Sequence, residues 1–150
     1  MDLEYLTSHW ASVRAGLLET IGKFRDNQLE FRPFATSWSA RQTILHIAQE
    51  EHGEFGYGII QALEAFPGEY NPKDYPNKAS LISLVESVHA QTLIYIERLA
   101  EDDLGRVIET PWGKSYRLIE MLGHLIEHEI HHRAELSLML GMLGHVGLDA

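Results

Sequence analysis

Histidines are concentrated near the C-terminal end of the sequence, and three of them, His124, His128 and His132, follow one another at intervals of four residues. In a helix, side chains four residues apart lie on one face. Two such imidazoles present two nitrogen ligands to one divalent metal, and a ligand from another helix completes a site with an open position. The spacing does not decide whether His124 and His128 or His128 and His132 bind the ion. His131 points about 100° away from these residues.

His46 is the candidate for the third ligand. It lies in the apolar run Ile44-Leu45-His46-Ile47-Ala48, where burial of a bare imidazole is costly unless a hydrogen-bond partner or a metal relieves that cost. The alternative is a hydrogen-bonded core histidine, but the i, i+4 pair elsewhere in the chain favours a metal. The histidines without such a pairing are interpreted as surface or locally bonded residues: His9, His52, His89 and His145.

Glu50 is a candidate for a general base. It lies one helical turn beyond His46, so it is predicted to face the same cavity as a base, as a hydrogen-bond acceptor behind a ligand, or as a fourth ligand. The alternative is that Glu50 is a solvated residue. Glu51 and Glu54 would then share with it a helix face that meets water.

Glu129 is a second candidate base. The segment from His128 to His132 matches H-E-x-x-H, the helical zinc motif whose glutamate is the general base of a metalloprotease. Glu135 and Leu138 occupy the downstream positions where one large class of these proteases has further motif residues. The short pattern also arises easily in a chain with nine histidines. We therefore keep Glu129 as a candidate base but do not predict a protease.

Composition excludes several kinds of chemistry. The chain has no cysteine, which rules out a disulfide framework, thiolate ligands and a cysteine nucleophile, so any thiol chemistry must use an external thiol. Its 12 basic and 22 acidic residues give a net charge of −10, from which we expect no nucleic-acid partner and no membrane partner. There is no signal pattern and no stretch that approaches the roughly 20 apolar residues of a membrane span. We expect a cytoplasmic protein.

The elements that must position these residues are helices. Apolar residues recur at helical spacing from Leu3 to Phe24, from a cap at Ser37 or Ser39 to Phe66, from Lys78 to Ala100, and from Arg117 to Met142. Residues 67–77 are rich in proline and predict a long crossing loop, and residues 106–116 can pair as a very short hairpin. We therefore expect residues 1–150 to form one all-α domain, a four-helix bundle with that hairpin between its third and fourth helices.

Two groups of residues within this frame predict local features. Glycines at positions 53, 56 and 58 weaken the second helix and indicate close packing or a bend there. Trp38, Tyr57 and Trp112 are candidates for the mouth of a pocket, although large aromatic residues near the ends of elements usually serve packing.

With these residues assembled, the chain resembles the DinB/YfiT family of four-helix-bundle metalloenzymes over nearly its whole length. The resemblance is carried by Ser37-Trp38-Ser39 leading to Leu45-His46-Ile47-Ala48, and by the run from His124 to Leu136. The family pattern has one histidine on helix two and two histidines four apart, ahead of an arginine, on helix four. The resemblance therefore implies that His46, His128 and His132 bind a divalent metal and that His124 is a neighbour. Ala134 departs from the usual glycine without removing a ligand.

The resemblance also implies a non-sequential connection of the helices and frequent homodimers. Related proteins include thiol-dependent transferases and isomerases. Our leading hypothesis is a metal-dependent enzyme of the thiol-dependent S-transferase type, which acts on a small-molecule substrate and activates a low-molecular-weight thiol or a water at the open metal position. The alternatives are a metal-dependent hydrolase with Glu50 or Glu129 as general base, and a non-catalytic metal-binding protein of a stress response or interaction. Zinc or nickel is the expected divalent transition metal.

Overall fold

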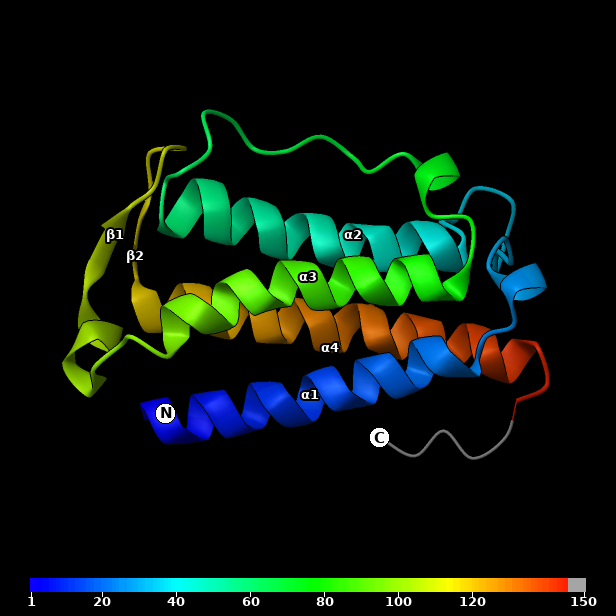
Figure 1. Cartoon of the computed structure of the whole chain (residues 1–150), viewed down its shortest axis with the longest axis horizontal. Coiled ribbons are helices and arrows are strands. Elements are labelled where there is room, and N and C mark those ends of the chain that lie inside the picture. The colour runs from blue at the N-terminus through cyan, green and yellow to red at the C-terminus, as the bar shows by residue number, and fades with distance from the viewer. Residues whose placement is uncertain (146–150) are drawn as a thin grey trace.

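The computed structural model describes residues 1–145, which fold into a bundle of four long helices and one small hairpin (Figure 1). The elements are α1 (Leu3–Lys23), α2 (Ala40–Gly53), α3 (Lys78–Ile96), α4 (Leu118–Met142), β1 (Val107–Glu109) and β2 (Ser115–Arg117). The predicted all-α four-helix bundle with its short hairpin is confirmed. Residues 146–150, the end of the expected single domain, lie outside the described part of the chain.

The helices do not pack in the order of the sequence. α1 packs against α4 and α3, whereas α2 packs against α3 and α4. In Figure 1, α1 and α2 therefore lie on opposite sides of the bundle, and the long segment of residues 60–77 runs back along the outside of α2 before α3 begins. This arrangement agrees with the non-sequential connection that the resemblance implied. It places α2 and α4, which carry the candidate ligands, side by side.

A capping box starts α2. The Ser39 hydroxyl oxygen accepts a hydrogen bond of 3.1 Å from the Gln42 backbone N–H, and the Gln42 side chain accepts one of 3.0 Å from the Ser39 N–H. Two N–H groups that have no partner within the helix are thereby satisfied. Of the two caps left open by the sequence, Ser39 is the one used, while the Ser37 hydroxyl bonds to the Phe34 carbonyl in the preceding turn.

α2 ends earlier than predicted. It continues from Gly53 into a π-helix, η2 (Glu54–Ile59), and the chain leaves the helical path at Ile60. Gln61 then adopts a φ of 53°, a left-handed conformation that turns the chain away from the helix axis. The prediction that this helix reaches Phe66 is therefore wrong. Short π-helical turns of this kind are frequent at functional sites.

Glycines around this bend allow two aromatic rings to lie against the helix backbone. A Cβ atom on Gly53 would lie 2.2 Å from the Phe66 ring, and one on Gly58 would lie 2.6 Å from the Trp112 ring. Both distances are far shorter than carbon atoms tolerate, so only glycine permits these contacts. The prediction that these glycines mark close packing and a bend is confirmed.

The hairpin covers one end of the bundle (Figure 1). β1 and β2 pair antiparallel, with Val107 opposite Arg117 and Glu109 opposite Ser115. α3 ends at Ile96 rather than at the predicted Ala100, and a 3-10 helix, η4 (Glu101–Gly105), leads from it into β1. The turn between the strands carries Trp112 to the backbone of η2.

By length and composition, α3 is the one helix among residues 1–145 that could cross a membrane, with a mean hydropathy of 1.2. The expectation that no such stretch exists therefore did not hold for this helix. In the bundle, α3 packs against α2 and α1. It buries His89 and Thr92 together with Leu81, Val85 and Ile96, while Leu93 and Ile94 are exposed.

The apolar interior is divided into two parts. One part includes Leu17, Ile44, Val85 and Leu140, and the other includes Leu6, Ile59, Ile96 and Leu122. On each helix, a buried charged or polar side chain lies between the two apolar parts: Arg14 on α1, Glu51 on α2, His89 on α3 and Glu129 on α4. We call these four residues the buried polar layer.

Candidate metal centre

The structure brings the side chains of His46, His128 and His132 together from the adjacent helices α2 and α4. The Nε2 atoms of His46 and His128 lie 3.0 Å apart, and one ring nitrogen of each histidine lies within 4.8 Å of the other two. The ring centre of His132 is 4.5 Å from that of His128, whereas that of His124 is 6.3 Å away. Three nitrogen donors grouped in this way could hold one divalent metal ion.

The protonation state of these histidines suits the same purpose. Burial, followed by the charges of His132 and His46, lowers the pKa of His128 to about 3. Burial, followed by the charge of His132, lowers the pKa of His46. Both rings are therefore neutral at neutral pH and keep the lone pair that a metal ion needs. The donor set fits a borderline-soft divalent metal in charge as well as in geometry.

Glu135 is a residue of the site that the sequence did not assign. Its Oε2 atom lies 2.7 Å from Nδ1 of His132. Because an ionised carboxylate only accepts hydrogen bonds, Nδ1 of His132 donates and its Nε2 retains a lone pair. The signal in the sequence was the i, i+3 spacing of His132 and Glu135 on one helix. His131, predicted to point away, is exposed and lies 3.3 Å from the other Glu135 oxygen.

Trp38 lies beside the histidines. Its ring centre is 4.5 Å from that of His46 and 6.0 Å from that of His132. Together with His46 and Tyr70, it lines a small cavity of about 140 Å³. The indole thus sits at a pocket next to the candidate metal centre, as predicted. Tyr57, by contrast, packs between the rings of two other aromatic residues, Phe66 and Trp112.

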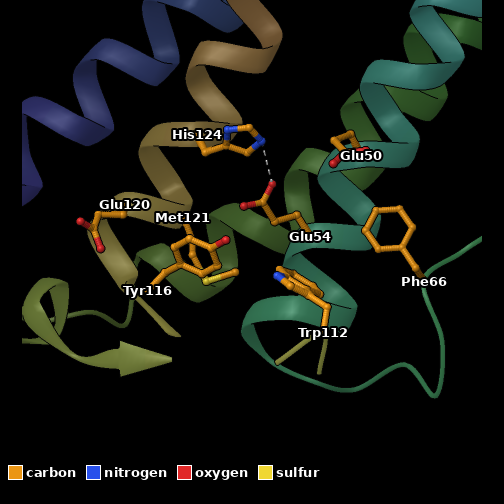
Figure 2. A pocket seen from close by; sticks show the side chains of 8 residues that line it. All are labelled: Glu50, Glu54, Phe66, Trp112, Tyr116, Glu120, Met121 and His124. Atoms are coloured by element: carbon orange, nitrogen blue, oxygen red, sulfur yellow. Dashed lines mark ion pairs between the residues drawn. The ribbon is translucent and has the colours of Figure 1, made fainter. Parts of the chain in front are cut away.

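A larger cavity of about 560 Å³ lies one helical turn from the histidines (Figure 2). Glu50 follows His46 by one turn on α2, and His124 precedes His128 by one turn on α4. Both Glu50 and His124 line this cavity. The other lining residues are Glu54, Phe66, Trp112, Tyr116, Glu120 and Met121. Glu50 lines this larger cavity, whereas His46 lines the smaller one, so the two residues do not share one cavity as the sequence predicted. The catalytic role of Glu50 stays a prediction.

The two carboxyl groups from the α2 side of this cavity have raised pKa values. Burial raises the pKa of Glu50, with a partial offset from His124 and His132. Burial, followed by the charge of Glu50, raises the pKa of Glu54 to about 8. The alternative, in which Glu50 would share with Glu51 and Glu54 a helix face that meets water, does not hold for Glu51 and Glu54, because both side chains are buried. The periodicity of α2 could not reveal this, since the atoms that cover Glu51 and Glu54 come from other elements.

The structure does not bring Glu129 to the histidines or to the cavity. Only 2% of Glu129 is exposed, and its Oε2 atom accepts hydrogen bonds of 2.8 Å from Arg14 and 3.1 Å from the Trp10 indole N–H. Its carboxylate faces the bundle interior, because position 129 is rotated by about 100° from position 128 on the helix. This placement favours Glu50 over Glu129 as a general base.

Glu129 belongs instead to the buried polar layer. Arg14 donates hydrogen bonds to Glu51 at 2.6 Å and to Glu129 at 2.8 Å, and Nδ1 of His89 lies 2.7 Å from the other oxygen of Glu51. Burial would raise the pKa of Glu51, but the hydrogen bond from His89 and the charge of Arg14 lower it. The interpretation of His89 as a surface or locally bonded residue is wrong, because His89 is buried and its partner Glu51 lies on another helix. The layer lies directly behind the candidate metal centre, since Glu129 comes between the two histidines of α4.

Comparison with known proteins finds relatives over almost the whole chain. The sequence is 27% identical over 145 residues to the uncharacterized protein YjoA of Bacillus subtilis (strain 168), a match that covers 95% of this chain and 92% of YjoA. The crystal structure of YjoA, a DinB-like protein, matches with a TM-score of 0.74 at 24% identity, over 97% of this chain and 96% of that chain.

Two further solved structures share the fold. YfiT from Bacillus subtilis, described as a probable metal-dependent hydrolase with an unusual four-helix bundle topology, matches with a TM-score of 0.72 at 18% identity, over 96% of this chain and 89% of that chain. A mycothiol-dependent maleylpyruvate isomerase matches with a TM-score of 0.68 at 12% identity, over 91% of this chain and 61% of that chain. At these identities the likeness shows the fold alone.

The bundle and its clustered histidines define the class of protein: a four-helix bundle with a candidate metal centre between its second and fourth helices. The model of the DinB superfamily matches residues 9–136, and the chain belongs to this family. The resemblance seen in the sequence is thereby confirmed.

The expectation that nucleic acids are excluded as partners is wrong. The colibactin self-resistance protein ClbS, solved in complex with a double-stranded DNA, shares this fold with a TM-score of 0.71 at 13% identity, over 97% of this chain and 98% of that chain. The net charge of −10 is a sum over the whole molecule and does not describe any one face of it. Phosphate contacts need only a local group of donors, so whole-chain charge was too coarse a criterion.

Proposed function

We propose that this protein is a divalent-metal-dependent enzyme that acts on a small molecule, with His46, His128 and His132 as metal ligands and Glu50 as the general base of a hydrolytic reaction. The observation that carries this proposal is the position of the three clustered histidines, one helical turn from a cavity lined by Glu50. Zinc or nickel is the proposed metal, because imidazole nitrogens suit both. A cytoplasmic location and a homodimer stay predictions from the sequence.

The donor set supports a catalytic metal rather than a structural one. Three protein ligands leave one coordination position of the metal open. A divalent metal held by the three histidines would supply Lewis-acid activation of a water or a substrate oxygen at that position. Glu135 keeps His132 in the tautomer that a ligand needs, and Trp38 covers the ring of His46. These contacts hold the rings in fixed orientations before any substrate arrives.

Glu50 is suited to take the proton from the attacking water. Its carboxylate lines the cavity, and burial raises its pKa above the ordinary value, the direction that favours a general base. Glu129 lacks this access because Arg14 and Trp10 hold its carboxylate in the bundle interior. The cavity, at about 560 Å³, has the size of a small-molecule site.

Metal analysis tests the ligand assignment. In protein purified without a histidine tag, we expect about one equivalent of a transition metal, which is lost in His46→Ala and in His128→Ala. His9→Ala is the control, since His9 lies on α1 and belongs to none of the groups of the described residues that could hold a metal ion. Metal retained in both ligand variants, or lost equally in the control, would contradict the assignment.

Substitution of Glu50 tests the reaction. In a screen of ester, amide and phosphoester substrates, Glu50→Gln is expected to lower kcat by about 10²- to 10⁴-fold while the metal content stays unchanged. Glu127→Gln, which removes a charge from an exposed position of α4, is the control. Full activity of Glu50→Gln would exclude Glu50 as the base.

Thiol transfer is the second candidate function. The chain has no cysteine, and a mycothiol-dependent enzyme shares its fold, so an external thiol is a reasonable nucleophile. Thiol transfer needs no carboxylate base if the thiol is already ionised, so Glu50→Gln should spare it. If the metal-loaded protein moves no common low-molecular-weight thiol onto electrophiles above background, this candidate falls. Metal binding without turnover in either screen would support the non-catalytic alternative.

A further inference from the structure

We propose that the 560 Å³ cavity binds a substrate that carries a positively charged nitrogen on an apolar body, with Glu54 as its charge partner and Trp112 as an aromatic wall. This inference rests on the proposed function in one respect, because it identifies the molecule bound in the cavity with the substrate of the adjoining candidate metal centre. The binding itself is argued from the cavity alone.

The cavity is acidic. Its lining includes Glu50, Glu54 and Glu120, and none of its eight lining residues is a lysine or an arginine. Glu120 lies at the surface with its carboxylate 3.0 Å from the Arg117 guanidinium, so its charge is already matched. Glu50 and Glu54 form no ion pair with a lysine or arginine in the described part of the chain. When these two carboxyl groups are ionised, neither has a permanent counter-charge.

Of the carboxylates that line the cavity, Glu54 is the one whose ionised form a bound cation would stabilise most. Only 9% of its side chain is exposed, and Figure 2 shows it directed into the cavity from η2. Nε2 of His124 lies 3.6 Å from its carboxylate, which is too long for a hydrogen bond. An ionised carboxylate that is buried without a permanent cation beside it is costly, and burial accordingly raises the pKa of Glu54 to about 8. A bound cation would relieve it.

Aromatic rings line the same cavity as Glu54. The ring of Phe66 lies against Gly53, which immediately precedes Glu54, and the ring of Trp112 lies against Gly58, one turn further on. The two glycines thus let these rings approach the helix on either side of Glu54. The face of an indole or a phenyl ring attracts an organic cation, most strongly when the site is partly shielded from water. A carboxylate and aromatic rings in one pocket suit the binding of an alkylated ammonium group.

The size of the cavity favours an organic cation over a bare metal ion. Glu50, Glu54 and His124 each offer one ligand atom within 4.8 Å of the others, so a second metal is the competing occupant of this position. A metal would use the carboxylates but would leave the apolar wall of Phe66, Trp112 and Met121 unfilled. An ammonium group with an apolar body uses both parts of the cavity.

A pair of isosteric probes tests the proposal. Choline carries a permanent positive charge, and 3,3-dimethylbutan-1-ol has the same shape without it. By calorimetry on metal-free protein, we expect choline to bind at least about tenfold more tightly than the alcohol. Equal binding of the two probes, or no binding of choline, would overturn the proposal.

Variants then locate the binding site. Glu54→Gln is nearly isosteric and is expected to weaken choline binding about tenfold, whereas the exposed Glu127→Gln should leave it unchanged. Trp112 lies in the hairpin turn and is 42% exposed, so Trp112→Leu should fold even if Glu54→Gln does not, and it should also weaken binding. Choline affinity that is unchanged in both cavity variants would overturn the assignment.

Two further measurements separate this proposal from its rivals. The same titrations on His46→Ala/His128→Ala should give unchanged choline affinity, because the cavity binds without the candidate metal centre. If choline does not bind, the cation-site proposal fails but the assignment of the metal ligands still stands. If the protein binds no metal, the ligand assignment fails but the cation-site proposal still stands. If zinc or manganese binds to the double variant through Glu54 while choline does not bind, the occupant is an inorganic cation and the proposal is wrong.

Discussion

The imidazole of His132 donates a hydrogen bond of 2.7 Å from Nδ1 to the carboxylate of Glu135, one turn further along α4. This contact selects the tautomer in which Nε2 carries the lone pair, and it fixes the rotation of the ring. The same helix therefore supplies two of the three clustered histidines and the group that orients one of them.

Removal of this carboxylate should weaken metal binding without removing a ligand. Glu135→Ala is expected to lower the affinity for zinc about 10- to 100-fold, because His132 loses its orienting partner. Competition with a chelator of known affinity measures the change. Glu127→Ala, at an exposed position of α4, is the control and should behave like wild type. Equal affinities in all three proteins would show that the contact has no role in metal binding.

Arg14 should be essential to stability because it neutralises two buried carboxylates. Arg14→Met leaves Glu51 and Glu129 buried without their cation, and we expect a loss of about 3–5 kcal/mol in the free energy of unfolding. Urea denaturation followed by circular dichroism measures it. Arg25→Met, at an exposed position, should cost less than about 0.5 kcal/mol.

A compensating variant checks the reason for that loss. Arg14→Met combined with Glu51→Gln and Glu129→Gln removes the charges together, so it should be more stable than Arg14→Met alone. If the triple variant is less stable than the single one, uncompensated charge is not the cause.

Glu54 should make the protein less stable as pH rises. Its pKa is about 8 in the folded protein against an ordinary value of 4.5, so between these values the folded protein holds a proton that the unfolded chain releases. The free energy of unfolding therefore falls with increasing pH across this range. Glu54→Gln carries no such proton, so its melting temperature should decline less than that of wild type. Thermal unfolding in a pH series measures both, and parallel curves would refute this account.

Ser39 should contribute to stability as the cap of α2. Ser39→Ala removes the side-chain partner of the Gln42 N–H, and we expect a loss of about 1 kcal/mol. Ser37→Ala is the comparison, because Ser37 bonds in an exposed turn and should matter less. Chemical denaturation of the two variants decides which serine is the cap in solution, and equal losses would contradict the assignment.

Helix positions and the clustered histidines could be predicted from the sequence because both follow from spacing along one chain. Apolar periodicity marked α1, α3 and α4 closely, and the four-residue interval placed His128 and His132 on one face. The end of α2 could not be predicted in this way. It depends on glycines that accept the rings of Phe66 and Trp112, which come from a distant loop and from the hairpin turn.

Burial of the acidic residues of α2 was not predictable for a related reason. Glu50, Glu51 and Glu54 are similar in sequence, yet Glu51 is neutralised by Arg14 from α1 and Glu54 faces a cavity closed partly by the hairpin. Which glutamate is buried depends on the neighbours that the non-sequential packing supplies. The same limit applied to Glu129, whose sequence motif suggested a base although its partners are Arg14 and Trp10.

The buried polar layer has a consequence for the alignment of the helices along the bundle axis. Each helix contributes one of its four members, and apolar residues lie above and below it on every helix. If any helix slid by one turn, a charged group would face hydrocarbon, so we expect one longitudinal register to be strongly preferred. His128 and His132 flank Glu129, and Glu50 precedes Glu51. The register that pairs the buried charges is therefore also the one that sets the histidines of α4 level with His46.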